Sequence, residues 1–169
     1  YISEHKLVPQ SIINTHAHID HIFGVAAVTD LYKIPFGIHE KDLPVLNSAQ
    51  GSAAMFGFDF GAAPKVDFYI QEDSPLKLGD DEIDVRFVPG HSPGSVAFYY
   101  KAGNWVIAGD ALFNGSIGRT DLPGGNHTQL ITSIKTQLLT LPGETRVHSG
   151  HGPDTTVGAE KNHNPFLTE

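Results

Sequence analysis

Residues 15–21, with the sequence Thr-His-Ala-His-Ile-Asp-His, constrain this chain more than any other segment. Three histidines and one aspartate fall within six positions, directly after a short apolar run. Because alternate residues of an extended segment point to the same side, His16 and His18 can bind one ion. Asp20 and His21 then turn towards a neighbouring ion. Imidazole and carboxylate groups suit zinc, iron, manganese or nickel, so the segment predicts a metal site rather than a solvated polar loop.

The composition indicates a globular domain that binds neither membranes nor nucleic acids. The 169 residues suffice for one domain with a real core, and the contents of 40% hydrophobic and 18% charged residues are ordinary. No apolar run approaches the length that spans a bilayer. The net charge of −8 opposes binding to nucleic acids and anionic membranes, because both require a basic surface. We therefore expect a small-molecule substrate.

The chain contains ten histidines and no cysteine. The absence of cysteine excludes disulfides, a catalytic thiol and any thiolate-bound metal. It is compatible with the cytoplasm, where we expect the protein to act. The remaining question is which of the ten histidines bind metal.

Hydrophobic patterning predicts strands interspersed with helices. We expect strands at residues 11–14, 35–39, 66–69, 83–88, 96–100, 105–108 and 145–148. We expect helices at residues 23–32 and 40–55, between Asn126 and Pro142, and at residues 157–162. Asn126 is the expected cap of the third helix, and Pro44 fits the first turn of the second.

Three further positions carry metal-binding side chains beside glycine, at or near the end of a predicted strand. They are His91, Asp110 and His151. Glycine allows the backbone to approach an ion closely. Strand ends are where α/β proteins gather a site from distant parts of the chain, so we expect these side chains to join those of residues 15–21.

These motifs resemble those of the metallo-β-lactamase superfamily. Residues 16–21 are similar to its HxHxDH signature, and three later segments are similar to its later motifs, in the same order: residues 89–95, 109–110 and 150–153. Within the superfamily, the loop at residues 118–121 and the tail at residues 155–166 most resemble small glyoxalase II-like (hydroxyacylglutathione hydrolase-like) proteins. The resemblance runs from Ser11 to Phe166.

The resemblance implies an α+β fold, an αββα sandwich with a dinuclear metal site at one edge of the packed sheets. The implied ligands are His16, His18 and His91 for the first ion, Asp20, His21 and His151 for the second, and Asp110 as a bridge. Zinc is the first choice of metal, with iron or manganese as alternatives. Asp20 and Asp110 are the implied catalytic residues, and Asp20 would also orient the nucleophile.

The chain is expected to form one domain over residues 1–169. Members of the superfamily have several strands before the HxHxDH motif, whereas fifteen residues precede His16 here. We therefore expect the N-terminal strands of the domain to be missing from this chain.

The implied reaction is hydrolysis of an acyl-thioester, of the hydroxyacylglutathione kind, by a hydroxide generated at the two metal ions. A thioester suits this chemistry because its thiolate leaves without strong acid assistance. Two alternatives stay open. One is a persulfide dioxygenase of the same superfamily, with a single iron bound by His16, His91 and Asp110. The other is an inactive metal-binding scaffold.

The remaining histidines match no motif of the superfamily, and we expect them to be structural or exposed: His5, His39, His127, His148 and His163. Arg119 and Asp121 allow two interpretations. They can form a surface ion pair of little energetic value. Alternatively, Asp121 or a neighbour orients a ligand imidazole, because metal-bound histidines usually donate their second N–H to a nearby acceptor.

Overall fold

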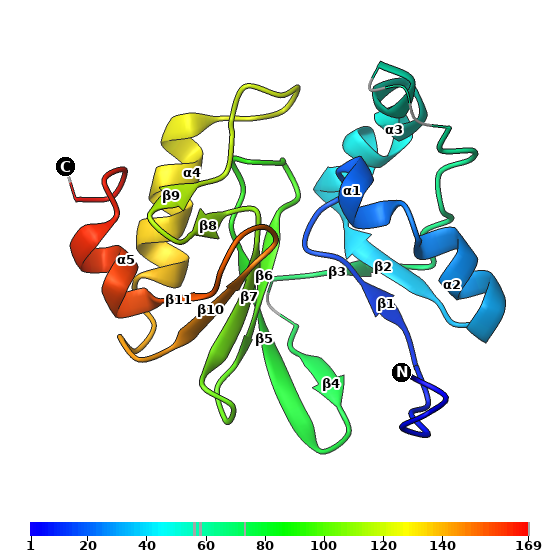
Figure 1. The fold of residues 1–169 in the computed structure, drawn as a ribbon, viewed down its shortest axis with the longest axis horizontal. Coiled ribbons are helices and arrows are strands. Elements are labelled where there is room, and N and C mark those ends of the chain that lie inside the picture. Colours follow the sequence, from blue (N-terminus) through cyan, green and yellow to red (C-terminus); the bar gives the residue numbers. More distant parts are fainter. Residues whose placement is uncertain (56, 58, 73, 169) are drawn as a thin grey trace.

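Two sheets packed face to face, with helices on both outer sides, form the core of this protein (Figure 1). The computed structural model describes residues 1–55, 57, 59–72 and 74–168. Within these residues the larger sheet has the strand order β11-β10-β7-β6-β5-β4, and the smaller sheet has the order β1-β2-β3. The expected αββα sandwich is therefore confirmed.

The larger sheet is mostly antiparallel, and only β10 and β7 run parallel to each other. Its strands are β4 (Leu76–Leu78), β5 (Asp81–Phe87), β6 (Val96–Tyr100), β7 (Trp105–Gly109), β10 (Arg146–Ser149) and β11 (Thr155–Thr156). The smaller sheet is parallel throughout and consists of β1 (Ile12–Ile13), β2 (Phe36–His39) and β3 (Phe68–Ile70). A separate hairpin joins β8 (Leu112–Phe113) to β9 (Ser116–Ile117).

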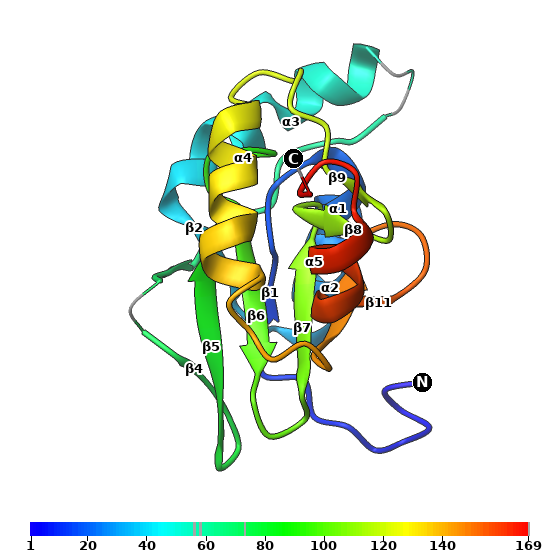
Figure 2. The same ribbon diagram turned by 90° about the vertical axis from the view of Figure 1, so that its left-hand side faces the viewer.

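Helices cover the two outer faces of the sandwich. The larger sheet is covered by α4 (His127–Ser133), its π-helical continuation η2 (Ile134–Leu138) and α5 (Val157–His163), as Figure 2 shows. On the other side lie α1 (Ile19–Ile22), α2 (Val25–Tyr32), the 3₁₀ turn η1 (Glu40–Asp42) and α3 (Leu43–Met55) (Figure 1). None of the helices in the described part of the chain is both long and apolar enough to cross a membrane.

Three apolar clusters fill the three interfaces between these four layers. One lies between the larger sheet and its helices and includes Val106, Leu130 and Ile134. A second, with Phe36 and Leu46, lies between the smaller sheet and α3. The third joins the inner faces of the two sheets. Each layer therefore buries apolar side chains against its neighbour, which is the main source of stability for such a fold.

The expected helix and strand positions agree with the structure to within a few residues, with local differences. Asn126 caps α4, as expected, because its Oδ1 accepts a hydrogen bond from the backbone N–H of Gln129 at 2.9 Å. Pro44 lies in the first turn of α3, where its missing N–H is harmless. The short strands β4, β8, β9 and β11, of two or three residues each, do not appear in the sequence-based prediction.

Candidate metal centre

The candidate ligands lie on loops and on one short helix that follow strand ends. His16 and His18 follow β1, and the next turn of the chain, α1, carries Asp20 and His21. Later loops supply the other three ligands: His91 after β5, Asp110 directly after β7, and His151 after β10. The structure brings all seven side chains together in two groups, each with its ligand atoms within 4.8 Å of one another.

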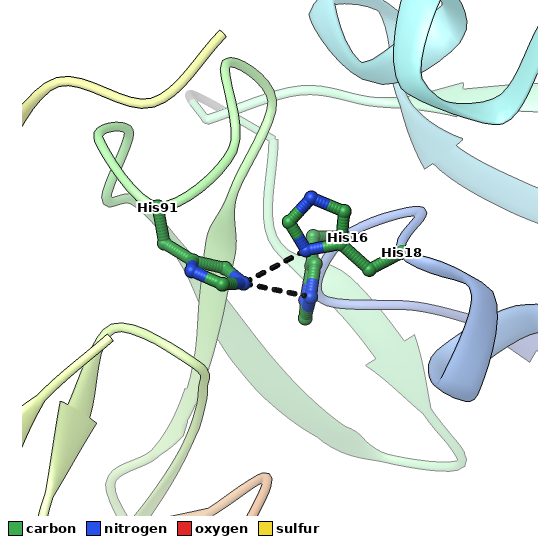
Figure 3. Close-up of side chains that lie close together, drawn as sticks. All are labelled: His16, His18 and His91. Atoms are coloured by element: carbon green, nitrogen blue, oxygen red, sulfur yellow. Dashed lines mark hydrogen bonds between the residues drawn. The ribbon is translucent and has the colours of Figure 1, made fainter. Parts of the chain in front are cut away.

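The first group, called the three-histidine cluster here, consists of His16, His18 and His91 (Figure 3). The Nε2 atom of His91 lies 2.8 Å from Nδ1 of His18 and 3.2 Å from Nε2 of His16. Three imidazole nitrogens from two chain segments therefore converge on one point. His16 is 1% exposed and His91 is 3% exposed, so the cluster is largely closed to water.

The orientation of His91 is fixed by a backbone carbonyl. Its Nδ1 donates a hydrogen bond of 2.8 Å to the carbonyl oxygen of Arg119, which leaves Nε2 free to act as a ligand. The Arg119 side chain points elsewhere and forms two hydrogen bonds of 2.7 Å with Asp121. The orienting group is thus the main chain of Arg119, the neighbour of Asp121, while the Arg119–Asp121 ion pair lies at the surface.

The second group, called the mixed cluster here, consists of Asp20, His21, Asp110 and His151. His151 Nε2 lies 2.9 Å from Asp20 Oδ2 and 3.5 Å from Asp110 Oδ2. His21 Nε2 lies 3.3 Å from Asp110 Oδ1. This group is more open, because the side chains of His151 and Asp20 are 59% and 51% exposed.

Asp110 lies between the two clusters. Its Oδ1 is 3.3 Å from His21 of the mixed cluster, and its Oδ2 is 3.7 Å from Nε2 of His91 in the three-histidine cluster. Two buried atoms here lack a hydrogen-bond partner, Asp110 Oδ1 and His21 Nε2. Buried polar atoms are rarely left unpaired, and both atom types are metal ligands. The donor set therefore fits two divalent cations with Asp110 between them.

The pKa values of His16 and His18 in the three-histidine cluster are lowered, whereas that of His21 in the mixed cluster is raised. Burial, together with the neighbouring His91, lowers the pKa of His18 to about 4, although Asp42 opposes this effect. Burial and the surrounding histidines also lower the pKa of His16 well below its ordinary value. Burial also lowers the pKa of His21, but the nearby Asp110 carboxylate outweighs it and raises this pKa overall. His16 and His18 of the three-histidine cluster are therefore held in the neutral form near neutral pH.

Gly150 makes room for the mixed cluster. A Cβ atom at this position would lie 2.1 Å from Asp110 Oδ1 and 3.0 Å from Cε1 of His21. The first contact is far too short for carbon and the second is tight, so any other residue would displace Asp110 and crowd His21. Gly150 therefore allows the backbone to approach the metal ligands closely, as the sequence predicts.

A cavity of about 820 Å³ opens over both clusters. Pro44, Val45 and Ala49 form one wall, at the start of α3. The loop with Leu122 and Pro123 also lines the cavity. Apart from the clusters themselves the lining is mainly apolar, and among its described residues Arg119 carries the only lysine or arginine charge. The cavity can therefore receive an apolar group directly above the candidate ligands.

The other histidines take part in contacts away from the two clusters. His148 Nδ1 pairs with Asp154 at 2.9 Å, and His39 Nε2 pairs with Glu72 at 3.0 Å. His127 is exposed at the start of α4. One buried residue that the sequence does not single out contacts the loops of the three-histidine cluster. It is Asp42, which is fully buried at the end of η1.

Comparison with known proteins identifies the family. Residues 2–151 match the profile of the metallo-beta-lactamase superfamily, so the chain belongs to this superfamily. The probable metallo-hydrolase YqgX of Bacillus subtilis (strain 168) is 47% identical over 169 residues, which cover 99% of this chain and 80% of that protein. The hydroxyacylglutathione hydrolase GloC of Haemophilus influenzae (strain ATCC 51907 / DSM 11121 / KW20 / Rd) is 35% identical over 173 residues, which cover 98% of this chain and 79% of that protein.

Solved structures give the same assignment. The BLEG-1 B3 metallo-beta-lactamase has a TM-score of 0.91 at 44% identity, with coverage of 99% of this chain and 81% of that chain. TTHA1623, solved in a di-iron-bound form, has a TM-score of 0.89 at 42% identity, with coverage of 98% and 81%. The two clusters of this chain thus fit a dinuclear site of the superfamily.

Proposed function

We propose that the protein is a metal-dependent hydrolase that cleaves an acyl-thioester, with a small hydroxyacylglutathione-like molecule as the substrate. The observation that carries this proposal is the position of Asp110, a carboxylate of the mixed cluster that also approaches the three-histidine cluster and whose Oδ1 has no hydrogen-bond partner. The ligands are those of the two clusters, and zinc is the first choice of metal. The similarity to GloC supports the choice of substrate class.

Two divalent ions supply, when bound, a hydroxide nucleophile at neutral pH and polarisation of the substrate carbonyl. The residues of this chain do the rest. Asp20 is half exposed at the floor of the cavity, so its free carboxylate oxygen can orient the nucleophile and accept its proton. The apolar wall with Val45 and Ala49 receives the acyl group and excludes water around it.

The cavity supports a compact acyl group better than a highly charged ligand. Arg119 is the only lysine or arginine among its described lining residues, so one carboxylate of the substrate has a partner there. Metal ligands supply the carboxylates in the lining, Asp20 and Asp110. This lining therefore matches a thioester that has an apolar or hydroxylated acyl group and carries one carboxylate close enough to reach Arg119.

The first test is the metal content per chain, measured by elemental mass spectrometry on protein purified without added metal. About two ions per chain, followed by cleavage of S-lactoylglutathione and other thioesters, would support the proposal. The same panel includes glutathione persulfide and a β-lactam, because BLEG-1 is a B3 metallo-beta-lactamase. One iron per chain with persulfide oxidation would replace the proposal by the dioxygenase. Cleavage of the β-lactam alone, or no bound metal, would overturn it.

A further inference from the structure

Asp42 is a buried carboxylate to which neither the ligand set nor the proposed reaction assigns a role. It ends η1, and its exposed fraction is 0%. A buried charge is expensive unless hydrogen bonds and nearby positive charge compensate it, so Asp42 calls for an explanation. Its hydrogen bonds provide one.

One oxygen of Asp42 holds the loop between the first two histidines. Oδ2 accepts a hydrogen bond of 2.6 Å from the backbone N–H of Ala17, the residue between His16 and His18. Ala17 is itself fully buried. The bond therefore fixes the main chain at the position from which both imidazoles diverge.

The other oxygen holds the loop of the third histidine. Oδ1 accepts hydrogen bonds from the hydroxyl of Ser92 and, at 2.7 Å, from the backbone N–H of Gly94. Ser92 directly follows His91. A Cβ atom on residue 94 would lie 2.5 Å from the backbone nitrogen of Asp42, so only glycine allows this approach. The side chain of Asp42 thus joins two loops that are far apart in the sequence.

We propose that Asp42 is the positioning residue of the three-histidine cluster, holding the loops of His16, His18 and His91 in register for one metal ion. Its three donors are all uncharged groups, and the three imidazoles bring no negative charge. A cation in the cluster therefore adds the positive charge that the buried carboxylate lacks. None of the three donors belongs to a residue of the mixed cluster, so the effect is confined to one of the two metal positions.

The test is titration of the metal-free protein with zinc(II) alone, in competition with a chromophoric chelator. Wild type is expected to bind two ions. Asp42→Asn keeps the shape of the side chain but turns one hydrogen-bond acceptor into a donor. The zinc affinity of the three-histidine cluster should therefore fall by about 10–100-fold, the usual effect of losing a group that orients metal ligands. The other position should keep the wild-type affinity. Ser92→Ala removes only one of the three bonds and should weaken the same position less.

Glu160 offers a matched control for a purely structural effect. It is 3% exposed and accepts three hydrogen bonds from uncharged groups of Thr155, Gly115 and Asn164. These bonds tie α5 to β11 and to the β8–β9 turn, not to the loops of the three-histidine cluster. Glu160→Gln should therefore lower the melting temperature while leaving both zinc affinities unchanged.

The outcomes separate this inference from the proposed function, on whose metal centre it rests. If wild type binds two ions and Asp42→Asn binds both equally well, or loses both equally, the positioning role is wrong and the metal centre stands. If Asp42→Asn does not fold, Ser92→Ala decides, because it must weaken one position selectively. If wild type binds no zinc, both the metal centre and the role of Asp42 are wrong.

Discussion

The two clusters use the same ligand chemistry in opposite surroundings. The three-histidine cluster is mostly buried, contains no carboxylate and is supported by the Arg119 carbonyl and by Asp42. The mixed cluster contains two carboxylates and is open to the cavity through Asp20 and His151. Its atoms are also less completely paired, since His21 Nε2 and Asp110 Oδ1 have no hydrogen-bond partner.

This difference suggests a division of roles between the two positions. A mostly buried cluster without carboxylates selects an ion by geometry, because its ligands are held before the ion arrives. An open cluster with two carboxylates attracts an ion by charge and leaves room for water and substrate beside it. Asp110 contacts both, so one position can influence the other through it.

The largest effect is expected from Asp110→Ala, which removes the contact between the clusters. Loss of one electrostatic contact typically lowers turnover by about hundredfold to thousandfold. Asp110→Ala should lower turnover further, because ligands of both metal positions are affected. Steady-state kinetics and zinc content on the same sample measure it. Asp154→Asn is the control, because Asp154 pairs with His148 outside the clusters. Turnover retained with both metals gone would contradict the mechanism.

Local ligand motifs are the part of the site that the sequence predicts well. Residues 16–21 carry four candidate ligands in order, and glycine precedes His91, Asp110 and His151. Asp42 shows the limit. In the sequence it belongs to a charged run that looks solvent-exposed, and its partners lie 25, 50 and 52 residues away. Burial of this kind depends on tertiary packing, which no local pattern encodes.

The next largest effect is expected on the stability of the metal-free protein and distinguishes the clusters directly. His16→Ala removes a buried side chain and should lower the free energy of unfolding by about 1–3 kcal/mol. His151→Ala removes an exposed side chain and should change it by less than about 0.5 kcal/mol. Urea unfolding in the presence of a chelator measures both. Equal losses for the two variants would mean that the clusters do not differ in rigidity.

Acid should act on His16 and His18 in the opposite direction from its action on His21. The lowered pKa values of His16 and His18 mean that only the unfolded chain takes up their protons between pH 6.5 and about 4. Stability of the metal-free protein should therefore decrease as the pH falls through this window. The raised pKa of His21 acts the other way, adding stability below its folded pKa.

Urea unfolding of the metal-free protein, with a chelator present, at several pH values between 7 and 4 tests this balance. His18→Gln should make the loss of stability with falling pH less steep, because it removes one group that resists protonation in the folded protein. His21→Gln should make the decrease steeper, because it removes the opposing group. If the stability of the wild type rose as the pH fell from 7 to 4, the lowered pKa values of His16 and His18 would be wrong.

The smallest effect is expected from Arg119→Gln, which tests whether the main chain alone orients His91. The substitution removes the exposed ion pair with Asp121 but keeps the carbonyl that accepts the hydrogen bond from His91. Metal content should be unchanged and stability should shift by less than about 1 kcal/mol. Because Arg119 is one of the residues that line the cavity, KM for a carboxylate-bearing thioester should rise a few-fold while kcat stays constant. Loss of one ion in this variant would show that the side chain supports the three-histidine cluster, whose rigidity would then not come from buried groups alone.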